Sequence, residues 1–121
     1  MGDPSEAFVQ IYKSMMDSAA WRDLSPGGRA AVLEVCRFYN GSNNGEIFLS
    51  ARKAGELLNV RPATAASYLK DAEAHGFIAQ VENGCLGLNG KGVAAKWRLT
   101  FQPANNQPPT RDYKSWARAK N

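Results

Sequence analysis

Two short helical patterns joined by a tight turn constrain this chain more than any other feature of its sequence. Ser50 is a good N-cap for a first helix over residues 51–58, and Gly76 is a good stop for a second helix over about residues 63–75. The connection is Asn59-Val60-Arg61-Pro62, whose proline suits the first position of the second helix. The pattern predicts two packed helices, the second of which projects from the body of the domain.

The segments on either side complete the plan. Ser25-Pro26 begins a predicted helix of about four turns that buries a stripe, and turn-forming residues 40–45 end it. The stripe consists of Ala31, Val32, Val35, Cys36, Phe38 and Tyr39. Residues 46–49 are β-prone, and residues 77–82 and 94–101 form a predicted hairpin around the glycine-rich run 83–92. The order predicts a mostly helical α+β fold, a winged helix-turn-helix with three core helices and a β-hairpin wing.

Spacing also predicts which side chains form the core. In the helix over residues 63–75, Ala65, Leu69 and Ala72 share one face, with Tyr68 at its margin. Trp97 alternates with Leu99 and Phe101, so we expect it to pack in the core rather than to stack on nucleic acid. Trp21, Met15 and Met16 are expected to be core residues as well.

The chain of 121 residues is long enough for one domain with flanking segments. Residues 1–24 are predicted to be an N-terminal helix or arm, and residues 25–102 the winged domain. Residues 103–121 are predicted to be a proline-containing linker and a basic aromatic tail with Tyr113 and Trp116. Pattern alone leaves open whether this tail folds back onto the domain or stays free.

Charge is distributed unevenly along the chain. Residues 1–49 carry four Lys or Arg and six Asp or Glu, a net charge of −2, whereas residues 50–121 carry eleven and five, a net charge of +6. The basic half is therefore the half with the two-helix motif, as expected of a partner for an anionic polymer. Chance asymmetry on an ordinary soluble surface is the alternative.

The candidate DNA contacts follow from the predicted faces. Four places in the predicted fold offer candidates for phosphate or base-edge contacts. They are the start of the first motif helix, the entry and exposed side of the second, the glycine-rich run, and the polar face of the last strand. The candidate residues are Arg52, Lys53, Arg61, Thr64, Ser67, Lys70, Lys91, Lys96 and Arg98. Asp71 is expected on the same exposed side. A solvated surface is the alternative for each of them.

Other classes of function find little support. No Ser/His/Asp set, P-loop or metal-ligand cluster is present, so we expect no enzyme, no cofactor and no metal. His75, the only histidine, falls at a helix end, where a cation is favoured. Cys36 and Cys85 lack CxxC spacing and are expected to be free thiols in a reducing cytoplasm. No apolar run is long enough for a membrane span.

Six stretches together look like a known group of proteins. They are residues 18–25, 39–45, 49–52, 64–78, 96–100 and 110–116. Together they resemble a family of small, mostly uncharacterised bacterial and phage-like helix-turn-helix proteins, over roughly residues 8–116. The motif itself is similar to that of many bacterial winged-helix regulators, although Ala66 and Ser67 stand where many of those carry arginine. The resemblance implies a winged helix and DNA binding.

We therefore expect a cytoplasmic, double-stranded-DNA-binding protein that acts in transcriptional regulation or in replication initiation on a phage or plasmid. The alternative is a protein-interaction module that uses the same fold without DNA, and salt dependence separates the two. RNA binding would need exposed stacking aromatics. The N-terminal segment is a candidate dimer arm, so both a monomer and a two-fold homodimer remain open.

Overall fold

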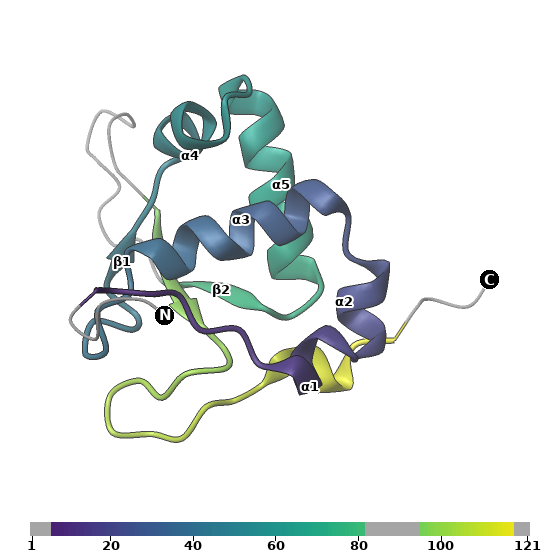
Figure 1. Cartoon of the computed structure of the whole chain (residues 1–121), viewed down its shortest axis with the longest axis vertical. Helices are drawn as coiled ribbons and strands as arrows, with labels where there is room; N and C mark the ends of the chain where they lie inside the picture. The colour runs from purple at the N-terminus through teal and green to yellow at the C-terminus, as the bar shows by residue number, and fades with distance from the viewer. Residues whose placement is uncertain (1–5, 82–94, 118–121) are drawn as a thin grey trace.

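Helices dominate the described part of this computed structural model, residues 6–81 and 95–117, and a small antiparallel sheet completes it (Figure 1). The elements are α1 (Lys13–Met16), α2 (Ala19–Asp23), α3 (Pro26–Arg37), β1 (Ile47–Phe48), α4 (Ala51–Leu58), α5 (Pro62–Ala74), β2 (Ile78–Val81), β3 (Lys96–Leu99) and the 3-10 helix η1 (Asp112–Ser115). The expectation of a mostly helical α+β fold is confirmed. The predicted glycine-rich loop lies outside the described residues.

Serine hydroxyls start three of the helices. The Oγ atoms of Ser18, Ser25 and Ser50 accept hydrogen bonds from the first-turn amides of α2, α3 and α4. The prediction that Ser25 and Ser50 cap their helices is confirmed. Helix α5 ends where expected, because Gly76 has a φ of 86°, a left-handed conformation that glycine adopts without strain.

The sheet has the strand order β1-β3-β2, so the last strand lies in the middle. Ile47 pairs with Trp97, and Ile78 pairs with Leu99. Trp97 is only 4% exposed, and its Nε1 donates to the backbone oxygen of Leu49 at 3.0 Å. The prediction that Trp97 is a core residue is confirmed, and its indole ties β3 to the entry of α4.

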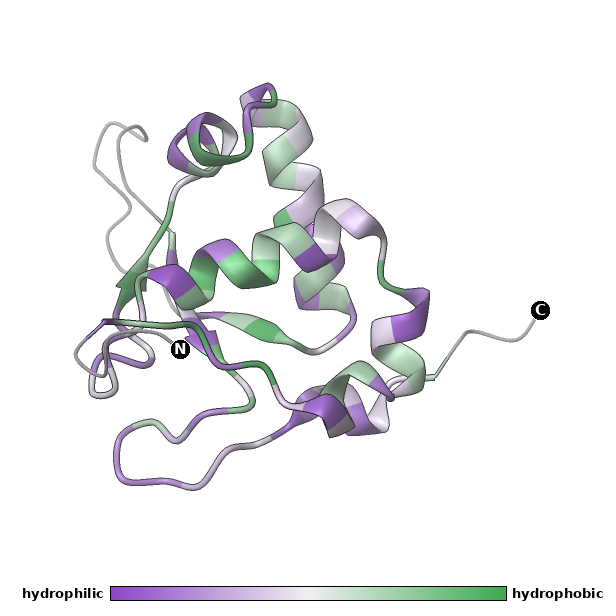
Figure 2. Ribbon diagram, viewed as in Figure 1, coloured by the Kyte–Doolittle hydropathy of each residue, from purple (hydrophilic) through white to green (hydrophobic). Residues whose placement is uncertain are grey.

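The core lies between α3, α5 and the sheet, and Figure 2 shows apolar residues along the middle of α3 and in β2. Two predictions for this core are wrong. Phe38 is 36% exposed because α3 ends at Arg37 and the chain leaves the helical face there. Met16 is 47% exposed because Met15 takes the inward position of the short α1. The remaining core predictions for α3 and α5 are confirmed, with Tyr39 and Tyr68 half-buried at the margin.

One buried amide organises the end of β3. Asn44 Oδ1 accepts a hydrogen bond from the Leu99 amide at 2.7 Å. Its Nδ2 donates to the backbone oxygens of Leu99 at 2.9 Å and Gln102 at 3.0 Å, with the Pro103 oxygen at 3.1 Å. This side chain supplies the hydrogen bonds that a neighbouring strand would otherwise supply.

The C-terminal tail, residues 110–117, folds back onto the domain, a question that pattern alone leaves open. It begins at the Arg111 amide, which donates to the Thr100 oxygen at 2.7 Å. Tyr113 is 4% exposed and stacks on Phe77 with ring centroids 5.0 Å apart. In Figure 1 the tail, drawn in yellow, lies beside α1 and α2. Tyr113 is therefore part of the same hydrophobic core as the helices.

Candidate nucleic-acid interface

The connection between α4 and α5 is built by three residues with different tasks. Asn59 takes a left-handed conformation, with a φ of 60°, at the end of α4. The Val60 amide then donates back to the Gly55 oxygen at 2.9 Å. A Cβ at Gly55 would lie 2.8 Å from the Val60 oxygen, so the turn closes this tightly only over a glycine. Gly55 is not among the predicted site residues, although a glycine inside a helical pattern is a signal of close approach.

Two of the predicted DNA-contacting cations meet at this turn. Arg52 lies in the first turn of α4 and Arg61 is the N-cap residue of α5, and both are exposed. Together with Glu56 and Asn59 they line one shallow hollow of about 520 Å³. In the described part of the chain, neither arginine makes an ion pair, whereas Lys53 Nζ lies 3.8 Å from Glu56 Oε1. The two guanidinium groups therefore stay available to an external anion.

Helix α5 presents the next group of predicted residues. Lys70 is exposed, and no carboxylate in residues 6–81 or 95–117 pairs with it. Ser67 is exposed too, but its hydroxyl donates to the Thr64 backbone oxygen at 2.9 Å, and Thr64 is half-buried. Asp71 does not join this face as expected, because its carboxylate turns toward Ser25 on α3. The exposed side of α5 therefore carries one cation and small polar groups.

The predicted cations of β3 form a separate group on the outer face of the sheet. Lys96 Nζ lies 3.4 Å from Glu46 Oε1 and 5.9 Å from the centre of the Phe48 ring. Arg98 donates to the Thr110 hydroxyl at 2.8 Å. Both side chains are half-buried, as expected of the face opposite Trp97, and both already have partners within the chain. Lys91 lies outside the described residues.

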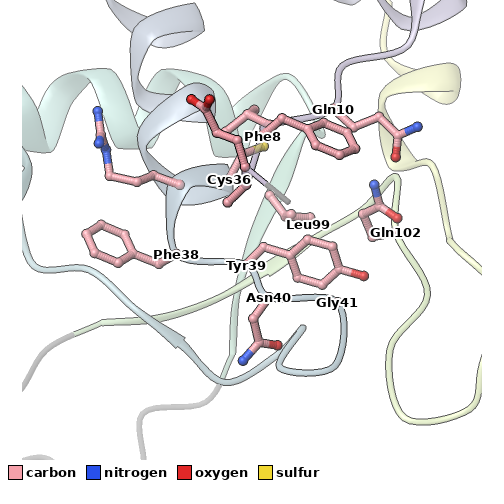
Figure 3. A pocket seen from close by; sticks show the side chains of 13 residues that line it. Phe8, Gln10, Cys36, Phe38, Tyr39, Asn40, Gly41, Leu99 and Gln102 are labelled. Atoms are coloured by element: carbon pink, nitrogen blue, oxygen red, sulfur yellow. The ribbon is translucent and has the colours of Figure 1, made fainter. Parts of the chain in front are cut away.

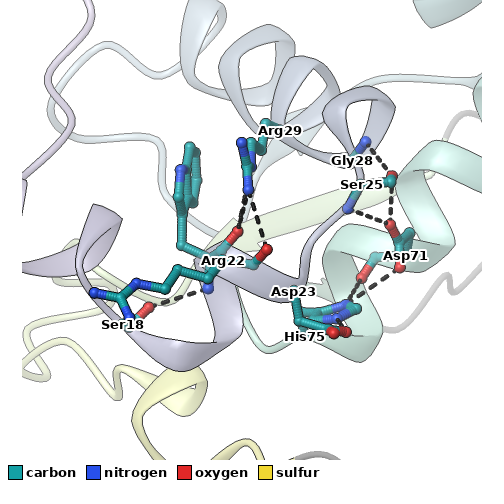
Figure 4. Close-up of polar contacts among 9 residues, drawn as sticks. Ser18, Arg22, Asp23, Ser25, Gly28, Arg29, Asp71 and His75 are labelled. Atoms are coloured by element: carbon teal, nitrogen blue, oxygen red, sulfur yellow. Dashed lines mark hydrogen bonds and ion pairs between the residues drawn. The ribbon is translucent and has the colours of Figure 1, made fainter.

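A polar cluster that the sequence did not reveal lies at the other end of α5 (Figure 4). Asp71 accepts hydrogen bonds from the Ser25 amide and hydroxyl, and His75 lies between Asp71 and Asp23 of α2. Burial lowers the pKa of His75, but hydrogen bonds and ionic attraction from Asp23 and Asp71 outweigh it and leave this pKa raised. His75 therefore lies at the helix end where the sequence predicts it, between the two carboxylates.

A second hollow, of about 540 Å³, lies between the N-terminal arm and the end of α3 (Figure 3). Phe8 and Val9 of the arm line it on one side, and Phe38 and Tyr39 on the other. Phe8 is 82% exposed, so most of its ring faces solvent, and Gln10 and Arg37 add polar groups to the same lining. Cys36 at its base is a free thiol whose pKa burial raises to about 12, which makes it a poor nucleophile.

No protein-family model, no curated protein and no solved structure matches the chain. Within residues 6–81 and 95–117, no group of three or more His, Cys, Asp or Glu side chains is placed to hold a metal ion. None of the helices described above combines the length and the apolar character needed to cross a membrane. What the site can do therefore follows from its own geometry and charge.

Proposed function

We propose that the chain is a winged helix-turn-helix protein that binds double-stranded DNA and is not an enzyme. The order α3, β1, α4, α5, β2, β3 and the strand order β1-β3-β2 support the fold assignment, together with the close α4–α5 connection. The resemblance to small helix-turn-helix proteins is part of this proposal. The observation that carries it is the pair Arg52 and Arg61, which flank the α4–α5 turn without an ionic partner among the described residues.

In the proposed complex, α5 enters the major groove, which is about 12 Å wide, and its N-terminal end meets the base edges. Arg52 and Arg61 contact phosphates on either side of the turn, and Lys53 joins them once it leaves Glu56. Lys70, further along α5, contacts a phosphate or a guanine. Lys91 in the proposed wing remains a predicted phosphate contact.

The exposed side of α5 supports modest rather than strong sequence selectivity. Lys70 is its one residue of the types that make bidentate contacts to guanine or adenine, because α5 contains no Arg, Asn or Gln. Lys96 and Arg98 reach DNA only by giving up Glu46 and Thr110. We therefore propose that phosphate contacts supply most of the affinity, in transcriptional regulation or in replication initiation.

Binding of a labelled generic duplex, followed by fluorescence anisotropy across a salt series, tests the proposal. Each phosphate contact contributes roughly 0.9 to the slope of log K against log salt concentration. A variant with Arg52, Arg61 and Lys70 all changed to alanine should bind more weakly, with a slope shallower by about 2–3. The control changes Lys13, Arg22 and Lys114, which are exposed on α1, α2 and η1, and so removes the same charge. Equal losses in the two variants, or no binding by the wild type, would contradict the proposal.

A protein-interaction module is the second candidate function, and one observation favours it. Several large apolar side chains of the arm, α1 and α3 are at least 36% exposed: Phe8, Val9, Tyr12, Met16, Leu33 and Phe38. Exposed apolar side chains in this number are typical of a surface that meets another protein, a second copy of the chain included. This candidate is favoured if the wild type does not bind DNA at any salt concentration but self-associates. A Phe8→Ser variant should then be monomeric.

A further inference from the structure

His75 is held by three segments of the chain at once. Its Nδ1 lies 2.8 Å from the backbone oxygen of Asp71 in α5, and its Nε2 lies 2.9 Å from Asp23 Oδ2 in α2. Its ring stacks on Trp116 of the C-terminal tail, with centroids 4.8 Å apart and planes inclined by 26°. The side chain is only 10% exposed, so a change on this ring affects α2, α5 and the tail together.

Both ring nitrogens face acceptors, because a backbone oxygen and an ionised carboxylate only accept hydrogen bonds. The protonated ring therefore donates at both ends. The neutral ring has a single hydrogen, so one nitrogen presents its lone pair to an acceptor, and one of the two hydrogen bonds of the ring, to α5 or to α2, is lost.

Each segment that packs against His75 carries charged groups. Helix α2 contributes Asp23 and also Arg22, which lines the same hollow as Asp23 and Trp116. Helix α5 contributes Asp71, whose Oδ1 lies 3.2 Å from Nδ1. The tail carries Asp112 and Lys114, both exposed and neither within ion-pair distance of the His75 ring. The groups within ion-pair distance are the two carboxylates, in agreement with the raised pKa of His75.

We propose that protonation of His75 fastens the C-terminal tail to α2 and α5. An imidazolium ring against the indole of Trp116 gains a cation–π attraction that the neutral ring lacks. Deprotonation removes this attraction together with one of the two hydrogen bonds that the charged ring donates. The tail then opens from its Trp116 end, while the buried Tyr113 stays against Phe77. The chain thus contains a proton-dependent latch that does not depend on DNA binding.

The latch can be tested by NMR on the protein without an affinity tag, because His75 is the only histidine in the sequence. Amide exchange, corrected for its intrinsic pH dependence, reports on the tail through the Trp116 amide, which donates to the Tyr113 oxygen at 3.2 Å. Its protection should fall several-fold as pH rises through the His75 titration. Protection of the Arg111 amide, at the other end of the tail, should stay constant. Protection at Trp116 that does not vary with pH would overturn the proposal.

Two variants separate the latch from a merely structural contact. In Trp116→Ala, the His75 titration should move to lower pH because the charged ring loses its stacking partner; an unchanged midpoint would overturn the proposal. In His75→Gln, nothing at this position titrates, so Trp116 protection should become independent of pH. Protection that still varies with pH in this variant would assign the effect to another group and overturn the proposal. If His75→Gln does not fold, Trp116→Ala and the wild-type exchange profile decide.

Discussion

The hydroxyl of Ser25 donates to Oδ2 of Asp71 at 2.6 Å and ties the first turn of α3 to the third turn of α5 (Figure 4). The same Oγ accepts a hydrogen bond from the Gly28 amide at 2.9 Å. The Ser25 amide also donates to Asp71 Oδ2, at 3.1 Å. Ser25 is therefore both a helix cap and a cross-link, and Asp71 sets the position of the proposed reading helix against the body of the domain.

Removing this cross-link should cost more than removing a cap. Ser25→Ala should lower the free energy of unfolding by about 2 kcal/mol, because it loses the cap and leaves Asp71 with fewer donors. The matched control is Ser50→Ala on α4, which loses only the bond from the Lys53 amide and should cost about 1 kcal/mol. Urea unfolding measures both, and a cycle with Asp71→Ala should give a coupling of about 1 kcal/mol. Additive effects would show that the contact contributes little.

Gly76 should tolerate no side chain. Its φ of 86° disfavours other residues, and a Cβ there would lie 2.6 Å from the Tyr113 backbone nitrogen. We expect Gly76→Ala to lower the free energy of unfolding by more than about 2 kcal/mol, since strain and displacement of the tail add. Gly41→Ala is the control, because Gly41 has a φ of 98° but a Cβ there would meet no atom within 4 Å. Gly41→Ala should lower the free energy of unfolding by only about 1 kcal/mol in the same thermal or urea unfolding experiment. Equal losses in the two variants would mean that the tail moves away from a Cβ at residue 76 at no cost in free energy.

The buried amide of Asn44 should not be replaceable by a carboxylate. Asn44→Ala leaves the Leu99 amide without an acceptor and should cost about 1–3 kcal/mol. Asn44→Asp keeps that acceptor but turns a negative charge toward the oxygens of Leu99 and Gln102, so it should cost more at neutral pH. Lower pH should restore part of its stability, because a protonated carboxyl donates again. Urea unfolding at two pH values checks this, and equal stability of the two variants at neutral pH would contradict it.

Stability should depend on pH through His75. Because the folded-state pKa is raised, the stabilisation is complete below the unfolded value of about 6.5 and is lost as pH rises through the folded value. The free energy of unfolding of the wild type should therefore fall as pH rises from about 6.5 through the raised pKa of His75. Denaturant unfolding of wild type and His75→Gln measures the difference. Parallel curves would show that His75 does not contribute this dependence.

Local signals in the sequence predicted the mostly helical α+β class and several of the helix ends. Ser25, Ser50 and Gly76 mark helix ends through hydrogen bonds and backbone conformations that depend on only a few neighbours, so they are readable from the chain. Helical spacing misplaces Asp71 because its partner, Ser25, is 46 residues away. The predicted cations of α4 and α5 are exposed as expected, but helical spacing could not show that Lys96 and Arg98 would pair with Glu46 and Thr110.

The returning tail has a consequence for how the protein is made. Tyr113 fills a place against Phe77 that no earlier part of the described chain fills, and Gly76 leaves the room for it. During synthesis the helices emerge first and can associate, but the core stays open on this side until residue 113 has left the ribosome. A product ending near residue 102 would leave Phe77 without Tyr113 and more exposed to solvent, so this side of the core closes only after residue 113 has been translated.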